Sequence, residues 1–277
     1  MTAREPNPDA VALLPPVTQS TRFWRGVNHT IITVFRLAML TTARRRYYEL
    51  DRIPRTGGVL VASNHISHLD AFTLSHAVRS AGRNPLGMGK IELFRIPIVG
   101  GWFTKIGHVS VDRSAPSPSA ALAPAAAALR SGKALCMYPE GTINTTPERG
   151  LLEGRTGIAR LALDSGVIVV PVGQWGPQHA VSATGQVSML RAPRLFGWLR
   201  ANRRPRRPVC ELIAGEPITP AELSAAAGSG ETGPDYRAVT DLIMDRIGAL
   251  VVGLSGLPEA ATVGGGTPAR KPKPERS

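Results

Sequence analysis

His65 and Asp70 are the two residues whose types and spacing point most directly to chemistry. A carboxylate bonded to one imidazole nitrogen leaves the other nitrogen free to accept a proton, as a general base does. Neighbours on one helix face stand three or four positions apart, whereas these two stand five apart. We therefore expect His65 in a turn and Asp70 in the first turn of the next helix, as a base and its orienting acid. A second interpretation stays open, in which Ser67 and Asp70 only cap that helix.

The flanking sequence predicts the elements that hold this pair. The apolar run Val59 to Ala62 follows two glycines and predicts a buried strand. The stretch Leu69 to Val78 predicts a helix with one apolar face. The polar residues between them thus stand at a strand-to-helix turn, where side chains can point into a crevice at the carboxyl end of a sheet.

The segment Asn64-His65-x-Ser67-x-x-Asp70 resembles the His-x4-Asp signature of the glycerophospholipid acyltransferase family, whose members include the 1-acylglycerol-3-phosphate acyltransferases. Further blocks follow in the family's order, ending near Gly173: Gly107 to Arg113, Tyr138 to Thr142, and Val167 to Gly173. The Tyr138 block is similar to Phe-Pro-Glu-Gly-Thr-Arg-Ser. Here Tyr138 replaces Phe conservatively, whereas Ile143 and Asn144 replace Arg and Ser and remove one cation.

The resemblance implies roles for particular side chains. His65 would be the base and Asp70 its orienting acid. Arg113 would contact the acceptor phosphate, for which a planar guanidinium is well suited. Arg155, where relatives often carry Lys-x-Gly, would partly replace the missing cation. The expected substrate-binding residues are Asn64, Ser67, Lys90, Arg113, Glu140, Gly141, Thr142 and Arg155.

Two finer expectations concern the same site. A carboxylate beside a phosphate repels it, so we expect Glu140 to bond a glycerol hydroxyl or a neighbouring arginine. The backbone amides of residues 64–67 are candidate donors to the oxyanion that forms during acyl transfer. We expect no metal, because His65-x-x-His68 has no further Cys/His cluster to complete a zinc site.

The resemblance implies an α/β fold with a mixed, largely parallel sheet flanked by helices. It also implies a reaction of phospholipid biosynthesis, in which a fatty acyl group moves from a thioester donor to a hydroxyl of lysophosphatidic acid or a related glycerol-phosphate acceptor. The donor, acyl-CoA or acyl-ACP, is a co-substrate, and no cofactor is expected. Glycerol-3-phosphate, another lysolipid and a glycolipid remain alternative acceptors.

The composition favours an anionic partner. The net charge is +13, from 33 Lys and Arg against 20 Asp and Glu. Nucleic acid is not expected, because the sequence lacks zinc-finger spacing, an RNP motif and a heptad zipper, and only 5% of its residues are aromatic. Cys136 and Cys210 stand in strand-like runs and predict buried free thiols in a reducing compartment.

The chain divides into four predicted parts. Residues 1–18 predict a disordered lead, 51–255 the acyltransferase domain, and 256–277 a disordered basic tail. Residues 19–50 predict an amphipathic membrane-interface helix or helical hairpin, with Arg44 to Arg46 as a cationic flank and Tyr47-Tyr48 at headgroup depth. An ordinary core helix is the alternative for this part.

These features predict a peripheral protein at the cytoplasmic face of the cell membrane. No window of roughly 18 to 20 residues is free of charge, so no spanning helix is expected. The arginine-rich stretch 191–207 reads either as a second membrane-facing surface or as a solvated loop.

Two other classes of protein compete with this interpretation. A serine hydrolase needs a nucleophile elbow, and no Gly-x-Ser-x-Gly occurs in the sequence. A non-enzymatic protein that binds anionic lipid or nucleic acid fits the charge, but it does not account for four blocks in the family's order.

Overall fold

The computed structural model describes residues 43–96, 99–105, 107–111, 116–181, 208–228 and 233–256, with residues 26, 30 and 33 as isolated positions. Several predictions fall outside these ranges. They concern the lead 1–18, nearly all of the interface segment before residue 43, Arg113, the stretch 191–207, and the tail after Gly256.

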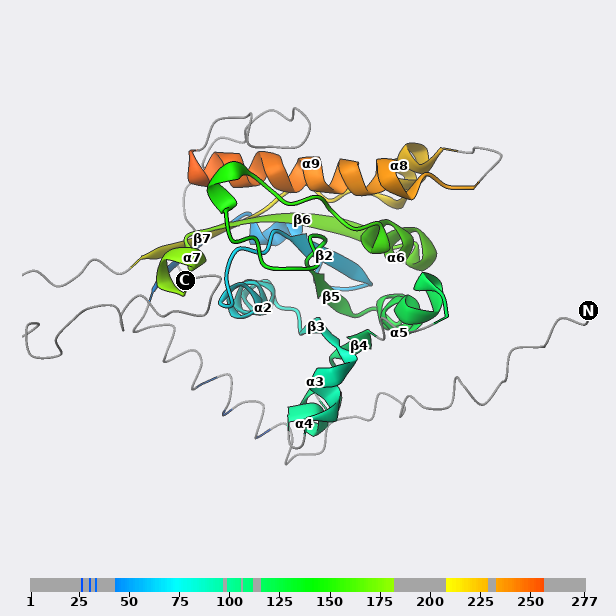
Figure 1. Cartoon of the computed structure of the whole chain (residues 1–277), viewed down its shortest axis with the longest axis horizontal. Helices are drawn as coiled ribbons and strands as arrows, with labels where there is room; N and C mark the ends of the chain where they lie inside the picture. The colour runs from blue at the N-terminus through cyan, green and yellow to red at the C-terminus, as the bar shows by residue number, and fades with distance from the viewer. Residues whose placement is uncertain are drawn as a thin grey trace, which may run out of the picture.

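The described residues form one seven-stranded sheet with the order β1-β7-β6-β2-β5-β3-β4 (Figure 1). Neighbouring strands run parallel, except for the antiparallel pair β6 and β7. The strands are β1 Arg44–Tyr48, β2 Val59–Ser63, β3 Pro85–Lys90, β4 Val109–Val111, β5 Ala134–Met137, β6 Ile168–Trp175 and β7 Val209–Ala214. The predicted mixed, largely parallel α/β sheet is thereby confirmed.

Helices cover both faces of the sheet, with α2 on one face and α9 on the other (Figure 1). Helices α5, α6 and α8 share the face of α9, because their apolar residues belong to one cluster. The helices are η2 Leu50–Arg52, α2 Asp70–Ser80, α3 Ile91–Arg95, α4 Val99–Lys105, α5 Pro118–Arg130, η3 Pro147–Arg149, α6 Gly157–Ser165, α7 Pro177–Ala180, α8 Pro220–Ala227 and α9 Tyr236–Ser255.

Strand β2 lies at the centre of the sheet and is buried along its whole length. Leu60 and Ala62 pack into the cluster under α5, α6, α8 and α9. Val59 and Val61 alternate with them and pack against α2 on the opposite face. A strand covered on both faces needs a continuous apolar run rather than an alternating one, and the sequence supplies that run.

Helix α9 lies directly on β6 because Gly173 has no side chain. A Cβ atom at Gly173 would stand 2.7 Å from the Cβ of Leu250, closer than two such atoms approach in proteins. The sequence predicts this helix over Tyr236 to Leu250, and the helix continues to Ser255, where Gly256 ends it in the left-handed conformation.

Residues 44–48 are a strand, so the predicted helical segment 19–50 is wrong at its carboxyl end. Strand β1 pairs in parallel with β7, with Arg44 opposite Val209 and Tyr48 opposite Ile213. Tyr48 is buried, and its hydroxyl donates to Glu211 at 2.9 Å, so it does not lie at headgroup depth. The α/β domain therefore begins at β1 rather than at residue 51.

Cys136 and Cys210 are both buried and unpaired with each other, as predicted. Burial raises the pKa of each thiol to about 12, so both stay neutral in the physiological range. Within the described ranges, every helix is too short or too polar to cross a bilayer.

Candidate active site

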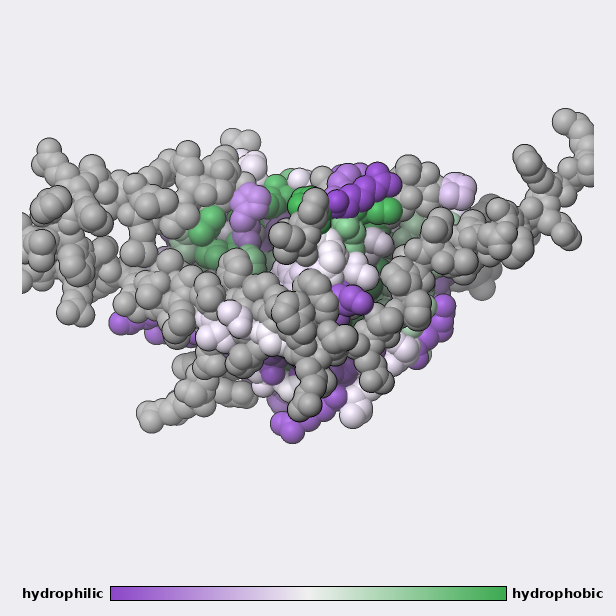
Figure 2. Space-filling model, turned by 90° about the horizontal axis from the view of Figure 1, so that it is seen from below, coloured by the Kyte–Doolittle hydropathy of each residue, from purple (hydrophilic) through white to green (hydrophobic). Residues whose placement is uncertain are grey.

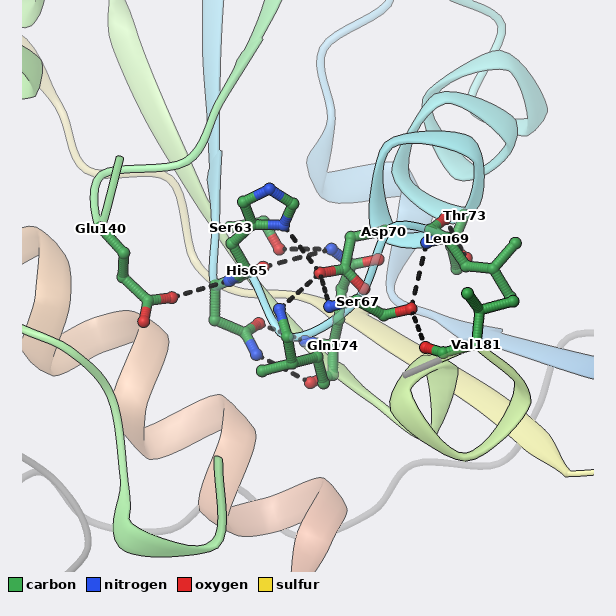
Figure 3. A network of polar contacts seen from close by, with 11 residues as sticks. Ser63, His65, Ser67, Leu69, Asp70, Thr73, Glu140, Gln174 and Val181 are labelled. Carbon is green, nitrogen blue, oxygen red and sulfur yellow. Dashed lines mark hydrogen bonds and ion pairs between the residues drawn. The ribbon is translucent and has the colours of Figure 1, made fainter. Parts of the chain in front are cut away.

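The predicted dyad forms at the carboxyl end of β2. His65 follows the strand, Asp70 is the first residue of α2, and the Nδ1 atom of His65 lies 2.9 Å from Oδ2 of Asp70. Asp70 is fully buried, whereas the His65 side chain is 19% exposed. The other ring nitrogen, Nε2, points away from the polar network (Figure 3). With its Nδ1–H donating to Asp70, the imidazole presents Nε2 as a proton acceptor.

The carboxylate of Asp70 also holds the turn that carries His65. Its Oδ2 atom accepts hydrogen bonds from the backbone N–H groups of Ile66, at 2.5 Å, and Ser67, at 2.7 Å. Burial raises the pKa of Asp70, while the bonds from His65 and these amides work in the opposite direction. The catalytic and the helix-start interpretations of Asp70 thus coexist, because one carboxylate orients the ring and fixes the turn.

Glu140, in the loop after β5, supports His65 from the other side (Figure 3). Its Oε1 accepts from the backbone N–H of His65 at 2.7 Å, and its Oε2 accepts from Leu152 N–H at 3.0 Å. The expected arginine partner is therefore wrong, because two backbone amides take that place. Burial raises the pKa of Glu140 from 4.5 to about 7 and outweighs both amide bonds.

The amides of the catalytic turn are engaged by carboxylates. The N–H groups of Ile66 and Ser67 donate to Asp70, and that of His65 donates to Glu140. The expectation that these amides stabilise an oxyanion is therefore wrong for these three positions. Sequence shows where a turn stands, but not which way its N–H groups point.

Asn64 and Ser67 are anchors of the turn, and both are fully buried. The Asn64 side chain bonds the backbone of Gln174 twice, donating to its carbonyl at 3.0 Å and accepting from its N–H at 2.8 Å. The Ser67 hydroxyl donates to the carbonyl of Val181 and accepts from Leu69 N–H. The predicted substrate contacts of Asn64 and Ser67 are thus replaced by contacts within the protein.

Tyr138 is a site residue whose role the sequence did not reveal. Its ring stacks on the imidazole of His65, with centroids 4.2 Å apart and an angle of 18° between the planes. The available signal was its position, since the residue at the carboxyl end of β5 stands beside the end of β2 in a parallel sheet. Gln174, near the carboxyl end of β6, is brought to the same place by the same topology.

Gly141 and Arg155 come together beside Glu140. The backbone N–H of Arg155 donates to the carbonyl of Pro139 at 2.9 Å. Gly141 has φ = 68°, and a Cβ there would lie 2.7 Å from Nε of Arg155. The exposed Arg155 side chain thus lies over the face that glycine leaves open.

The remaining predicted site residues are less closely defined. Thr142 is exposed, one residue beyond Gly141. Lys90 ends β3 opposite Val111 of β4. Arg113 lies outside the described residues. Substrate contacts by these three residues stay predictions. Over the described part of the chain, no group of three His, Cys, Asp or Glu side chains is arranged to hold a metal ion.

The fold and the site together define an α/β protein with a His-Asp general-base dyad at the carboxyl end of its central strand. Residues 44–175 match the family model described as Acyltransferase. This match spans every described part of the dyad and its supporting loop, and it confirms the resemblance that the sequence blocks indicated.

Curated relatives point the same way. A Streptococcus pneumoniae protein named 1-acyl-sn-glycerol-3-phosphate acyltransferase is 28% identical over 152 residues, which are 54% of this chain and 53% of that protein. A Limnanthes alba protein of the same name is 33% identical over 114 residues, 40% of this chain and 38% of that protein. The chain thus matches about half or less of the length of these relatives.

A solved structure shares the fold. The crystal structure of the 1-acyl-sn-glycerophosphate (LPA) acyltransferase PlsC from Thermotoga maritima superposes with a TM-score of 0.56 at 20% sequence identity. The superposition covers 84% of this chain and 80% of that structure.

Proposed function

We propose that this protein is an O-acyltransferase that moves a fatty acyl group from a thioester donor to a free hydroxyl of lysophosphatidic acid. The observation that carries the proposal is the 2.9 Å contact between His65 and the buried Asp70, which leaves the second imidazole nitrogen directed away from the network. The names of the curated relatives supply the acceptor class.

His65 acts first as a base and then as an acid. Its Nε2 takes the proton of the acceptor hydroxyl as the oxygen bonds to the thioester carbonyl carbon. The resulting tetrahedral intermediate expels the thiolate, which receives the same proton from the imidazolium, so that ester and free thiol leave. Asp70 holds the tautomer and stabilises the imidazolium in between. General-base assistance contributes roughly 10²–10⁴-fold, and positioning supplies much of the remainder.

Arg155 is our candidate for the contact to the acceptor phosphate. Its exposed guanidinium lies against Gly141, next to the glutamate that supports His65. A guanidinium can bond two phosphate oxygens at once. This placement offsets the absence of a cation at Ile143, where the motif that the block resembles carries arginine. Lys90 and Arg113 remain additional candidates.

We also propose that the protein works at the cytoplasmic face of the cell membrane as a peripheral protein. The net charge of +13 would attract it to an anionic lipid surface, and the lipid acceptor resides there. Among the residues coloured in Figure 2, hydrophobic groups stand close to strongly hydrophilic ones on the face seen from below. Such a mixture suits the boundary between headgroups and acyl chains.

The decisive experiment incubates the full-length protein with acyl-CoA or acyl-ACP and a panel of acceptors, followed by mass spectrometry of the products. The panel contains lysophosphatidic acid, glycerol-3-phosphate and a lysoglycolipid. We expect phosphatidic acid from lysophosphatidic acid and little product from the other two. Hydrolysis of the thioester at the same rate without acceptor would instead identify a hydrolase.

Two variants test the dyad in that assay. His65→Ala should abolish transfer while leaving the thermal midpoint nearly unchanged, because the ring is partly exposed. Asp70→Asn should also cripple turnover, since an amide in place of the carboxylate favours the wrong tautomer. Turnover by His65→Ala above about a tenth of wild type would contradict the proposal.

A further inference from the structure

Three buried oxygen atoms behind the dyad lack a hydrogen-bond partner within the described part of the chain. They are Oη of Tyr138, Oε1 of Gln174 and Oδ1 of Asp70. Gln174 and Asp70 are fully buried as residues. Native interiors satisfy nearly all such groups with protein partners or ordered water, because an unsatisfied one is costly.

The three atoms belong to one neighbourhood. The ring of Tyr138 stacks on His65, and His65 bonds Asp70 through Nδ1. The electrostatic neighbours of the Tyr138 hydroxyl are Asp70, Cys136 and Gln174. The amide of Gln174 is fixed in orientation, because its Nε2 donates to Oγ of Ser63 at 3.0 Å and leaves Oε1 as the unused acceptor.

The donors and acceptors in this group match the capacity of a single water molecule. Tyr138 offers one O–H donor, while Gln174 and Asp70 offer one acceptor oxygen each. A water accepts from one donor and gives its two protons to two acceptors, and buried waters typically make about three such bonds. We propose that one ordered water links these three atoms, and that Tyr138 acts through it as a positioning residue for the His65-Asp70 dyad.

This inference rests on the proposed function and adds a residue to the same site. The motif that the block resembles carries Phe where this chain carries Tyr138. A phenyl ring can stack on His65 as well as a phenol, so the hydroxyl is the feature particular to this chain. Through the water it supplies Asp70 with a donor on Oδ1, whereas Oδ2 already accepts from His65, Ile66 and Ser67.

The chemical consequence is a change in the proton affinity of the pair. A hydrogen bond to the carboxylate stabilises its charged form and weakens its attraction for a proton or an imidazolium. Removal of the phenol therefore strengthens proton binding by the dyad, whose titration belongs to both residues together. The protonated dyad cannot act as a base, so activity should be lost at a higher pH.

Other titratable or charged groups lie around Asp70 and must be separated from this effect. Cys136 on β5 and Cys210 on β7 have pKa values raised by burial to about 12, so they stay neutral during the assay. Arg45 on β1 is a neighbour of Cys210 and carries a fixed positive charge. Glu140 titrates near neutrality, since burial raises its pKa to about 7.

The test is the pH profile of kcat/KM for Tyr138→Phe in the full-length protein, with lysophosphatidic acid and acyl-CoA. We expect the midpoint of the acid limb to rise by about half a pH unit or more, with turnover about threefold to tenfold lower at neutral pH. The same shift should persist when Tyr138→Phe is made in a Glu140→Gln background.

Tyr48→Phe is the matched control, because it removes a buried hydroxyl that bonds Glu211 in a cluster without any dyad residue. It should leave the acid limb in place. A high-resolution crystal structure should also show a water within hydrogen-bond distance of all three oxygens.

An acid limb that is unchanged in Tyr138→Phe, a shift that vanishes in the Glu140→Gln background, or a crystal structure without the water would overturn this inference. These outcomes leave the proposed function standing as long as His65→Ala is inactive. Failure of the proposed function has a different sign, namely a His65→Ala variant that still transfers acyl groups.

Discussion

The carboxylate of Glu140 accepts a hydrogen bond from the backbone N–H of His65 at 2.7 Å, across a separation of 75 residues in the sequence. Asp70 holds the same histidine by its ring. The catalytic residue is thus fixed at both its backbone and its side chain by two different acids. Glu140 comes from the loop after β5 and Asp70 from α2, so the neighbouring strand and the covering helix jointly set the direction of the imidazole.

Glu140→Gln should lower kcat by about tenfold to a hundredfold while changing the acceptor KM less than about twofold. A glutamine presents one acceptor oxygen, so it cannot serve the amides of both His65 and Leu152. Steady-state kinetics with lysophosphatidic acid separates the two parameters. Exposed Glu148 in η3 provides the control Glu148→Gln, which should behave as wild type. A rise confined to KM would return Glu140 to a role in acceptor binding.

The pH dependence of stability offers a second test of Glu140. Burial raises its pKa from 4.5 to about 7, so the folded protein binds more protons than the unfolded chain between these values. The free energy of unfolding of wild type, relative to Glu140→Gln, should therefore fall as pH rises through this window, by about 3 kcal/mol in total. Urea titrations at several pH values measure it.

His108 should show the opposite trend in the same experiment. Burial lowers its pKa from 6.5 to about 4, with a smaller contribution from the charge of Arg79. The unfolded chain then binds the extra proton between these values, so the contribution of His108 is complete above pH 6.5 and is lost as pH falls toward 4. Parallel curves for His108→Gln and Glu140→Gln would refute both assignments.

Asn64→Ala should destabilise the fold by about 2–4 kcal/mol, because the N–H and the carbonyl of Gln174 each lose a partner in a fully buried place. Chemical denaturation measures the loss. Activity that survives below the lowered thermal midpoint should retain the wild-type acceptor KM. An unchanged stability together with a raised KM would restore the substrate contact that the sequence suggested.

Gly141→Ala should raise the KM of a phosphorylated acceptor about fivefold or more, because the new methyl group displaces the guanidinium of Arg155. The positive φ of 68° adds a stability cost of about 1 kcal/mol. Gly166→Ala is the matched control, since Gly166 has φ = 64° and open space around its would-be Cβ. It should lose similar stability and keep the KM, whereas Arg155→Ala should reproduce the KM effect alone.

The sequence predicted the sheet, the central strand and the dyad because each depends on local pattern. The apolar run of β2 is buried on both faces, and the His-x4-Asp spacing fits a turn followed by a helix start. It did not reveal β1, because three arginines and two tyrosines also suit the end of an interfacial helix. The pairing that makes them a strand joins Arg44 to Val209, far along the chain.

The polar residues of the turn show a second limit. Residue type indicated that Asn64, Ser67 and Glu140 would form hydrogen bonds, but not with which partner. Each bonds the backbone of a residue elsewhere in the fold or the turn, which only the assembled sheet brings within reach. Tyr138 was read as a conservative replacement for the same reason, since its hydroxyl gains meaning only beside Asp70 and Gln174.

Strand β1 has one more consequence for how the chain is connected. The backbone N–H of Arg44 donates to the carbonyl of Pro208, and the carbonyl of Val181 accepts from Ser67 in the catalytic turn. The two arginine-bearing stretches that precede residue 43 and follow residue 181 are therefore tethered at the same corner of the body, within reach of the imidazole. If both stretches bind lipid, that corner would rest on the bilayer, and an acceptor could be acylated without first being extracted into water.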